Sequence, residues 1–426
     1  MKYLIHLARI VVGNLFIFSG IVKANDPLGL SYKLEEYFIE FGMNWDWLNE
    51  ILVPLAALLC IVEIVLGIAV LVGYRMKIIS TLLLLMIVFF TILTGASAIF
   101  DIVRECGCFG DAIPLTPWQS FYKDLILLVF ILLLFVKRNS IEPFKSSKTD
   151  LIYFIVSFII MGLLSVMLDW YFPMVFVLLV LGIAVLVKPK LGAKSAALAV
   201  ALSLLGSLWF SMDAIAHLPP KDFRAYAVGK NLPEQMTLPE DAKPSVYENI
   251  LTYKNKSTGE EKDFTMDEYN AQRIWEDKNW EWVATDSKLI EQGDEAKITD
   301  FTISNMDGDD YTDYFLEKPK VFLLIMYDLA ATKTDKFGRI NSFAKEAQEA
   351  GIDFIALSAA GYNQVNDFRH THQTPFDFYI TDGIVLKTMV RSNPGLIYME
   401  NGTVKAKWHN NDIPTFAEVK KNYIKE

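Results

Sequence analysis

The sequence predicts a polytopic α-helical membrane bundle of about seven transmembrane helices, followed by an extracytoplasmic α/β domain. Long apolar stretches are concentrated in the first half of the 426 residues, and charged residues in the second half. Residues 1–212 carry 15 Lys and Arg against 14 Asp and Glu, whereas residues 213–426 carry 25 against 36. From about residue 296, strand and helix patterns alternate. The average composition, 53% hydrophobic and 21% charged, therefore combines two unlike parts.

The composition excludes several classes of protein. An apolar content of 53% excludes an intrinsically disordered chain. Three cysteines in 426 residues are too few for a disulfide-rich secreted scaffold. The charged half is acidic and has no basic run, so no nucleic acid partner is expected. The lipid bilayer is the first partner that the sequence predicts.

Seven apolar stretches are long enough to cross a bilayer, which takes about 17–25 residues. The fifth and sixth are separated only by Asp169 and Trp170. This spacing predicts a tight hairpin, with Trp170 and Tyr171 at the level of the lipid headgroups. The first stretch also resembles a cleaved signal peptide, but six further spans favour a retained helix. The candidate spans are residues 4–22, 51–73, 78–99, 119–136, 150–168, 171–187 and 195–212.

Basic residues predict how these spans are oriented. Eleven Lys and Arg lie in or beside the loops on one side, and four lie on the other side before residue 213. The positive-inside rule then places the N-terminus in the cytoplasm. Seven spans place residues 213–426 outside. The expected location is the inner membrane of a bacterium, crossed several times, with residues 213–426 in the periplasm.

Three motifs follow one another along the first four spans. The first lies at the end of span one, the second lies inside span two, and the third precedes span four. In order they are Ser19-Gly20-Ile-Val-Lys23 with Asp26-Pro27, Glu63-Ile-Val-Leu-Gly67, and Cys106-Gly107-Cys108-Phe109-Gly110-Asp111.

Taken together, this ordered set resembles the DoxX and methylamine-utilisation MauE group of four-helix membrane proteins, over about residues 1–140. The resemblance implies a helical bundle linked to thiol–disulfide chemistry outside the membrane. MauE-like members are associated with disulfide formation in partner proteins, and DoxX-like members with quinone-linked or thiol-linked redox reactions. A quinone is therefore the cofactor that the resemblance suggests, and periplasmic thiol proteins are the partners.

Cys106 and Cys108 are the first candidate catalytic residues. A disulfide between cysteines one residue apart closes a small strained ring, and strain makes a disulfide easier to reduce. Such a bond closes no long loop, so it adds little stability. A redox-active pair is therefore the main interpretation, beside an inert disulfide, packed thiols or half of a metal site. Asp111 could relay a proton to or from this pair.

Glu63 is the second candidate, because an ionisable group near the middle of a span usually marks a proton path, a ligand site or an ion pair. Arg9, in the cytoplasmic part of span one, is the expected charge partner and a second member of a proton or quinone site. Cys60 lies one helical turn from Glu63 and is either a packing residue or a third thiol. Lys23 is expected either to snorkel to the interface or to border the reactive loop.

The second half of the chain has two expected parts. Residues 213–292 predict a β-rich connector with a hairpin at 247–253 and 262–265. Residues 293–426 have the order β, βα, β, α, β, α, hairpin, which resembles the thioredoxin-like fold of TlpA and peroxiredoxin relatives. Asn393-Pro394 occupies the place of that fold's cis-proline loop. Four domains are expected: residues 1–140, the three further spans of 141–212, the connector of 213–292 and the α/β domain of 293–426. The expected strands of the α/β domain are 298–303, 321–327, 353–358, 376–380, 393–398 and 404–408.

The resemblance to thioredoxin ends at the active site. The cysteines of that fold would follow the strand at 321–327, where this chain has Asp328, and no cysteine follows Cys108. This domain therefore cannot perform thiol chemistry. The expected surface near Asp328 and Pro394 holds extended peptide in the parent fold and is a candidate partner-binding site. No metal site is expected, because His370 and His372 do not share a helix face.

The sequence thus predicts a membrane-bound thiol–disulfide redox protein. The exchanging pair is Cys106 and Cys108, electrons pass through the bundle towards a quinone, and the cysteine-less domain docks a partner. The alternative is a non-enzymatic envelope assembly or interaction protein anchored by the bundle, which the missing active-site pair and the acidic surface favour. A transporter built around Glu63 is a third hypothesis, although no inverted repeat is visible.

Overall fold

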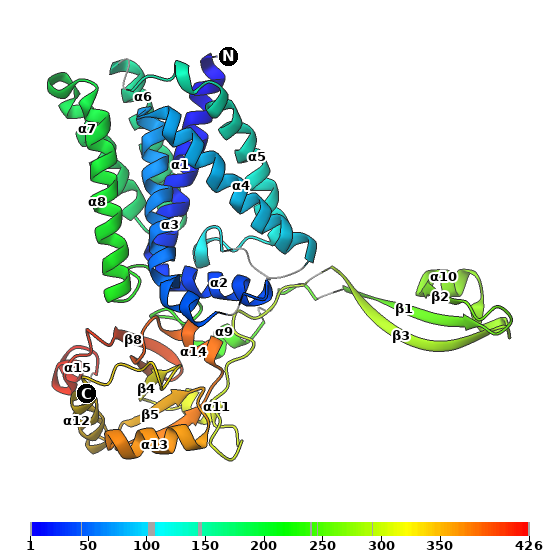
Figure 1. Cartoon of the computed structure of the whole chain (residues 1–426). Coiled ribbons are helices and arrows are strands. Elements are labelled where there is room, and N and C mark those ends of the chain that lie inside the picture. The colour runs from blue at the N-terminus through cyan, green and yellow to red at the C-terminus, as the bar shows by residue number, and fades with distance from the viewer. Residues whose placement is uncertain are drawn as a thin grey trace.

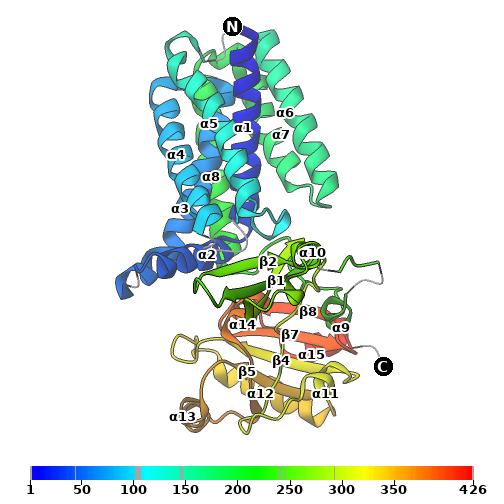
Figure 2. The same cartoon turned by 90° about the vertical axis from the view of Figure 1, so that its right-hand side faces the viewer.

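The computed structural model describes residues 2–424, except for 44, 101–106, 144–146, 239–240, 245 and 292. Within this described part, seven helices are long and apolar enough to cross a membrane. They pack side by side, and the α/β domain lies at one end of the bundle (Figures 1 and 2). We call the end of the bundle that faces the α/β domain the docking end. The predicted multi-pass membrane half is confirmed. The helices are α1 (Lys2–Asn25), α3 (Asp46–Val72), α4 (Met76–Phe100), α5 (Pro117–Val136), α6 (Ser147–Met167), α7 (Phe172–Leu191) and α8 (Lys194–Ala216).

Helices α1 and α3 form the centre of the bundle and approach each other closely. A Cβ atom added at Gly20 would lie 2.9 Å from the backbone nitrogen of Ile64 and 3.0 Å from the carbonyl oxygen of Cys60. A Cβ atom at Gly67 would lie 2.7 Å from the carbonyl oxygen of Gly13. Small residues allow such contact between membrane helices, whose association depends on close packing and hydrogen bonds. The approach at Gly20 brings polar side chains of the two helices within bonding distance.

A short helix, α2 (Pro27–Glu40), runs across the docking end (Figure 1). The side chain of Asp26 caps it by accepting a hydrogen bond of 2.9 Å from the backbone N–H of Gly29. Pro27 is the first helical residue, a position where the missing N–H costs nothing. The helix therefore begins at Pro27. It lies between the bundle and the α/β domain (Figure 2).

The turn between α6 and α7 is a tight hairpin, as predicted, with Asp169 in the left-handed region at φ 48°. Trp170 is only 8% exposed, and its ring lies 6.2 Å from that of Phe210 and 5.9 Å from that of Phe223. The expectation that Trp170 faces the lipid headgroups is therefore wrong, because its ring fills the space beside α8 and the segment after it. Tyr171 is exposed.

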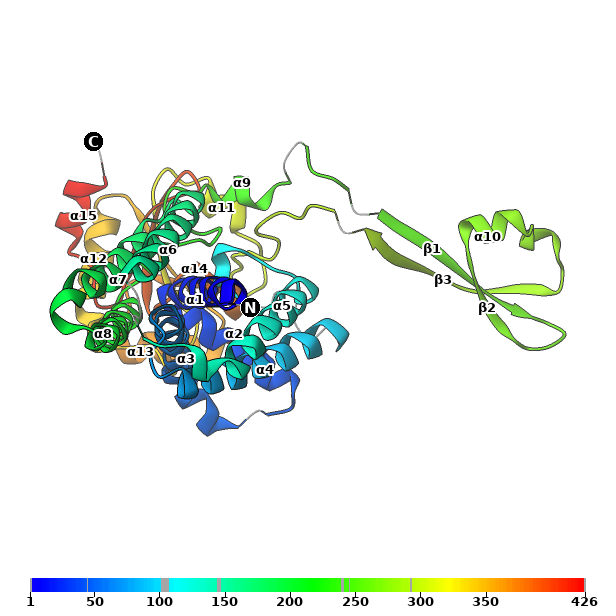
Figure 3. The same ribbon diagram turned by 90° about the horizontal axis from the view of Figure 1, so that it is seen from above.

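A three-stranded antiparallel sheet, here called the arm, extends away from the rest of the molecule (Figures 1 and 3). Its strand order is β2-β1-β3, and the predicted hairpin is confirmed by the pairing of β1 with β2. Phe264 is buried between the rings of Tyr253 and Trp280. The elements of this region are α9 (Leu232–Met236), β1 (Val246–Asn255), β2 (Glu261–Thr265), α10 (Met266–Ala271), the 3₁₀ turn η3 (Ile274–Glu276) and β3 (Trp280–Glu291).

A five-stranded sheet of order β6-β5-β4-β7-β8 forms the centre of the α/β domain. Strands β4, β5 and β6 are parallel, whereas β7 is antiparallel to β4 and to β8. Alternate residues of β4 face opposite sides, so Phe322 packs with α12, α13 and α15, and Leu323 packs with α11 and α14. From β4 onward the predicted order of strands and helices is confirmed. The elements are α11 (Thr312–Leu316), β4 (Val321–Met326), α12 (Phe337–Glu349), β5 (Asp353–Ser358), α13 (Tyr362–His372), β6 (Asp377–Ile380), α14 (Gly383–Met389), β7 (Gly395–Glu400), β8 (Thr403–His409) and α15 (Phe416–Asn422).

The strand predicted at residues 298–303 is wrong. This segment contains a bend at residues 299–300 and forms no strand, and isolated bridges join the next residue, Ser304, to Asp310 and Ile380. Its apolar residues Ile298, Phe301 and Ile303 are buried against the sheet face that carries Leu323. Face packing and strand pairing give the same apolar alternation in the sequence, which explains the error.

The folded α/β domain is expected to lose stability in acid through His409. Burial lowers the pKa of His409 to about 4, and its Nδ1 accepts a hydrogen bond of 3.1 Å from the backbone N–H of Asn411. Because an unfolded histidine titrates near pH 6.5, the unfolded chain binds more protons between pH 4 and 6.5. The free energy of unfolding should therefore fall by about 1–3 kcal/mol as the pH drops from 6.5 to 4.

Hydrogen exchange of the β7 and β8 amides in the full chain measures this loss. His409→Asn removes the titrating ring and keeps an oxygen that can accept the Asn411 hydrogen bond. The unfolding free energy of this variant should therefore fall less between pH 6.5 and pH 4. An equal loss in this variant and in the wild type would contradict the assignment to His409.

Candidate functional site

A buried ion pair joins α1 and α3 near the docking end. Lys23 Nζ lies 2.6 Å from Glu63 Oε1, and the two side chains are 7% and 3% exposed. The hydroxyl of Ser19, one turn before Lys23 on α1, lies 2.9 Å from Glu63 Oε2. Both carboxylate oxygens therefore have a donor, as a charge inside a bundle requires.

Arg9 is not the partner of Glu63, contrary to the expectation. Its guanidinium donates to the carbonyl oxygens of Val70 at 2.9 Å and Leu71 at 2.5 Å, and it lies 4.4 Å from the centre of the Tyr153 ring. Arg9 thus binds the last turn of α3, where unpaired carbonyls favour a cation. This position is far along the bundle from Glu63, and Arg9 has no place in the site.

Cys108 lies in a loop that contacts the ion pair. We call residues 106–113 the cysteine loop; Cys106 lies outside the described residues. The Ser19 hydroxyl lies 3.0 Å from the carbonyl oxygen of Cys108, so its single hydrogen can be donated either to that oxygen or to Glu63. Gly107 adopts φ 66°, a left-handed conformation that favours glycine. The turn at Gly107 therefore lets Cys108 approach the end of α1.

A small cavity of about 30 Å³ lies between α1, α3, α4, α5 and the cysteine loop, and is here called the membrane-side cavity. Its lining is mainly apolar, with two ammonium groups near aromatic rings. Lys23 Nζ lies 4.9 Å from the centre of the Phe90 ring, and Lys123 Nζ lies 5.7 Å from that of Phe109. Both lysines lie within electrostatic range of the Cys108 sulfur. The lining residues are Leu15, Phe16, Ser19, Lys23, Glu63, Ile87, Phe90, Cys108, Phe109, Lys123, Asp124 and Leu127.

A second ion pair borders this cavity. Lys123 pairs with Asp124, and the Thr94 hydroxyl of α4 donates to Asp124 Oδ2 at 3.1 Å. Cys60 is fully buried on α3 one turn before Glu63, and Lys23 lies within electrostatic range of it. Cys60 does not line the membrane-side cavity. The structure therefore separates Cys60 from the cavity surface that Cys108 helps to form.

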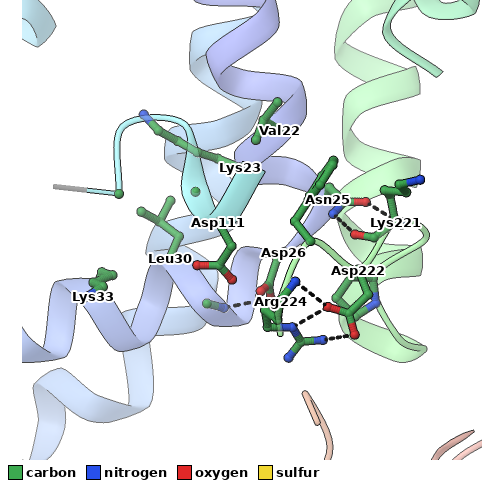
Figure 4. A pocket seen from close by; sticks show the side chains of 15 residues that line it. Val22, Lys23, Asn25, Asp26, Leu30, Lys33, Asp111, Lys221, Asp222 and Arg224 are labelled. Carbon is green, nitrogen blue, oxygen red and sulfur yellow. Dashed lines mark hydrogen bonds and ion pairs between the residues drawn. The ribbon is translucent and has the colours of Figure 1, made fainter. Parts of the chain in front are cut away.

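A second small pocket, of about 40 Å³, lies on the other side of the cysteine loop and is here called the domain-side pocket (Figure 4). Three segments line it: the junction of α1 and α2, the cysteine loop, and residues 219–224, which follow α8. Asn25 fixes the third segment through two hydrogen bonds to the backbone of Lys221, of 2.6 and 3.0 Å. Lys23 lines both the pocket and the membrane-side cavity.

Asp111 faces this pocket with Asp26 (Figure 4). Burial raises the pKa of Asp111, and Arg391 of the α/β domain, 3.4 Å away, only partly offsets it. Asp26 is also buried, but the guanidinium groups of Arg391 and Arg224 outweigh burial and hold the pKa of Asp26 below its usual value. Asp111 therefore binds a cation of the other domain, and its expected role as a proton relay stays a prediction.

Asp328 is exposed and lines an open groove of the α/β domain, so its expected role in partner binding stays a prediction, whereas Pro394 is buried. Asp328 Oδ1 accepts hydrogen bonds from the backbone N–H groups of Ala330 and Ala331, and its carbonyl oxygen accepts one from Asn393 Nδ2. The Asn393–Pro394 bond is cis, as the resemblance implies, but Pro394 is buried. In this conformation Pro394 cannot contact a partner, which corrects the expectation.

Two family models match parts of the chain. Residues 1–137 match the family of methylamine utilisation protein MauE. The part of the membrane half that ends with α5 is thus similar to this family. Residues 247–292, in the arm, match a domain of unknown function, DUF8463. The MauE part of the predicted resemblance is confirmed, and the DoxX part stays a prediction.

Two individual proteins are similar to parts of this chain. Protein TlpB from Flavobacterium psychrophilum is 32% identical over 155 residues, which are 34% of this chain and 40% of TlpB. The match thus spans less than half of that relative. The solution structure of a protein assigned as a disulfide isomerase from Bacteroides thetaiotaomicron aligns with 16% identity and a TM-score of 0.24. That alignment covers 29% of this chain and 82% of the other.

Sequence reasoning missed the partner of Glu63 and the role of Arg391. Lys23 was a candidate, but its position at a helix end is equally typical of a snorkelling lysine. Ser19 stands in the first motif and could have been paired with Lys23 by helical spacing. Arg391 lies 280 residues after Asp111, and no local pattern indicates their contact.

Removing one member of the Lys23–Glu63 pair should destabilise the bundle. Lys23→Met leaves a buried carboxylate without its cation, which should cost about 3–5 kcal/mol of unfolding free energy. The double variant Lys23→Met with Glu63→Met should recover most of this loss, because no charge then remains buried. The measurement is denaturant unfolding of the detergent-solubilised chain.

The matched control is the exposed pair Lys33–Glu36 on α2, 3.0 Å apart. Lys33→Met should change the unfolding free energy by less than about 1 kcal/mol. If the double variant of Lys23 and Glu63 were as unstable as the sum of the single variants, the two groups would not be coupled.

Proposed function

We propose that this chain is a membrane thiol–disulfide redox protein whose exchanging pair is Cys106 and Cys108. The observation that carries the proposal is the position of the cysteine loop between two cavities. Charged side chains from three segments line the domain-side pocket, which borders Gly107, whereas the membrane-side cavity has fewer charged side chains and borders Cys108. A loop in this position can meet a thiol protein on one side and an apolar electron acceptor on the other.

The proposed reaction has two balanced steps. A client protein gives up two thiols and gains a disulfide, and the Cys106–Cys108 disulfide becomes two thiols. The two electrons and two protons of this pair then pass to an electron acceptor, so the loop disulfide forms again; a quinone at the membrane-side cavity would supply this oxidising power and leave as a hydroquinone. The apolar walls formed by Ile87, Phe90 and Leu127 suit the ring of such an acceptor.

The charged residues of the site have distinct proposed roles. Lys23 and Lys123 present positive charge to the Cys108 sulfur, which favours the thiolate that attacks or leaves in exchange. Glu63 fixes Lys23 and accepts from Ser19, so it holds the ammonium group in place. Glu63, which lines the membrane-side cavity and accepts a hydrogen bond from Ser19, is the proposed group that exchanges a proton with a bound quinone.

Other observations support the same class of function. MauE-like proteins, which the membrane half resembles, are associated with disulfide formation in partner proteins. The thioredoxin-like fold of the α/β domain is consistent with a domain that recognises thiol proteins. Because this domain has no cysteine, the redox step is proposed for the membrane half alone.

Thiol trapping in membranes tests the proposal. In a Cys60→Ala background, a maleimide of added mass should label no cysteine when quinone is present. It should label both loop cysteines when quinone is depleted, because the pair can then no longer be oxidised. Client disulfides should fail to form when Cys106 and Cys108 are both changed to Ser.

The control is Cys60→Ala alone, which should leave client disulfides intact. If both loop cysteines stayed in one redox state throughout, and their removal left client disulfides untouched, the redox proposal would be wrong. The non-enzymatic assembly role would then be the better account, since it requires no change at either cysteine.

We further propose an inner-membrane location with the N-terminus in the cytoplasm, on the strength of the distribution of basic residues. Alkaline phosphatase fused after residue 426 should then be active, because that enzyme folds only where disulfides form. The same reporter fused at residue 193, between α7 and α8, should be inactive. The opposite pattern would place the cysteine loop in the cytoplasm and remove the proposed oxidising side.

A further inference from the structure

Arg391 connects the α/β domain to three segments of the membrane half. It precedes the cis-proline loop, and its side chain is 6% exposed. Arg391 Nε donates to Asp26 Oδ2 at 2.8 Å, and Nη2 lies 3.4 Å from Asp111 Oδ2 in the cysteine loop. The guanidinium also lies 5.3 Å from the centre of the Tyr32 ring on α2. One buried cation therefore meets the start of α2, its second turn and the cysteine loop.

The surrounding contacts show which face of the α/β domain meets the bundle. Tyr327, the first residue after β4, donates or accepts a hydrogen bond of 3.1 Å with the Tyr32 hydroxyl. Lys387 of α14 pairs with Glu35 of α2 at 3.2 Å, and its ammonium lies 4.8 Å from the Tyr32 ring. This is the face where a thioredoxin carries its cysteines, after the strand that corresponds to β4. Helix α2 covers part of it.

The two carboxylates that meet Arg391 are not equivalent. The Asp26 side chain is 17% exposed and forms the short bond, while the Asp111 side chain is 42% exposed and forms the longer one. The Arg391–Asp26 bond therefore fixes the guanidinium against the membrane half. Nη2 of the same planar guanidinium group is then held towards Asp111. A lysine, with a single ammonium group, cannot reproduce this arrangement.

We propose that Arg391 is a positioning residue for the cysteine loop, and that the cysteine-less thioredoxin-like domain serves as a fixed support for this loop. The domain holds Asp111 from outside while Ser19 holds the Cys108 carbonyl from the bundle side. Cys108 is thereby kept between the two cavities. The proposal rests on the proposed function for its importance in exchange, but the support itself is a physical property of the loop.

The experiment measures how fast Cys108 reacts with a maleimide in the native full chain. Cys60→Ala and Cys106→Ser leave Cys108 as the sole thiol, so neither a client nor a quinone is needed. In this background, Arg391→Ala should raise the labelling rate by about five- to tenfold, because losing one charge-assisted contact of about 1–1.5 kcal/mol makes the loop open more often. Asp111→Asn should raise it by a similar factor and leaves the interior of the α/β domain untouched.

Three comparisons separate positioning from general stability of the interface. Arg391→Lys, which can still pair with Asp26, should give an intermediate rate. Lys387→Ala breaks a contact of the same interface that does not reach the loop, so its rate should stay within about twofold of the parent. Combining Arg391→Ala with Asp111→Asn should add little to either change, because both break one contact.

An unchanged labelling rate in both Arg391→Ala and Asp111→Asn would overturn the proposal. So would an equal increase in Lys387→Ala, which would make Arg391 an ordinary interface residue. The outcome is independent of the redox proposal. If the variants released the loop as expected but its cysteines never changed their redox state in membranes, the positioning role of Arg391 would hold and the proposed redox function would be wrong.

Discussion

The buried pair between Lys23 and Glu63 is the interaction on which the rest of the membrane half depends. Two charges in a bundle are tolerated only when each is paired and its remaining hydrogen-bonding capacity is used. The close approach of α1 and α3 at Gly20 brings the pair together, and Ser19 satisfies the second carboxylate oxygen. The same Ser19 reaches the Cys108 carbonyl, so the pair that stabilises the bundle also determines where the cysteine loop lies.

The α/β domain acts on the same loop from the opposite side. It retains the strand order and the cis-proline of a thioredoxin-like fold but has Asp328 where cysteines would follow β4. Its corresponding face is turned towards α2, and Arg391 reaches past α2 to Asp111. In the proposed account, a domain without cysteines holds in place the loop of another domain that exchanges disulfides.

Much of the fold could be predicted because hydropathy and strand alternation are local signals. The seven spans and the strands from β4 to β8 follow directly from apolar periods in the sequence. Glu63 and the cysteine pair could be singled out because buried carboxylates and adjacent cysteines are rare in such positions. Their surroundings could not, since hydropathy does not determine how each helix is rotated about its axis. Arg9 therefore seemed as good a partner for Glu63 as Lys23.

The contacts of Arg391 had no sequence signal at all. Its partners Asp26 and Asp111 lie hundreds of residues earlier in the chain, and only the docking of two domains brings them together. The segment at 298–303 shows a different limit of sequence-based prediction. Its apolar pattern was visible, but the same pattern fits either a paired strand or a segment packed on the face of the sheet. Local patterns thus predict elements, whereas the polar site depends on long-range packing.

The midpoint potential of the loop pair tests the central claim most directly. The purified Cys60→Ala chain is equilibrated in dithiol–disulfide buffers, and labelled thiols are counted by intact mass. The account predicts one transition from zero to two labels, with the two-electron dependence of about 30 mV per tenfold change in the equilibrium constant. It also predicts a more negative midpoint when Lys23 and Glu63 are both changed to Met, because the ammonium that favours the thiolate is lost. No transition, or the same midpoint in both proteins, would contradict it.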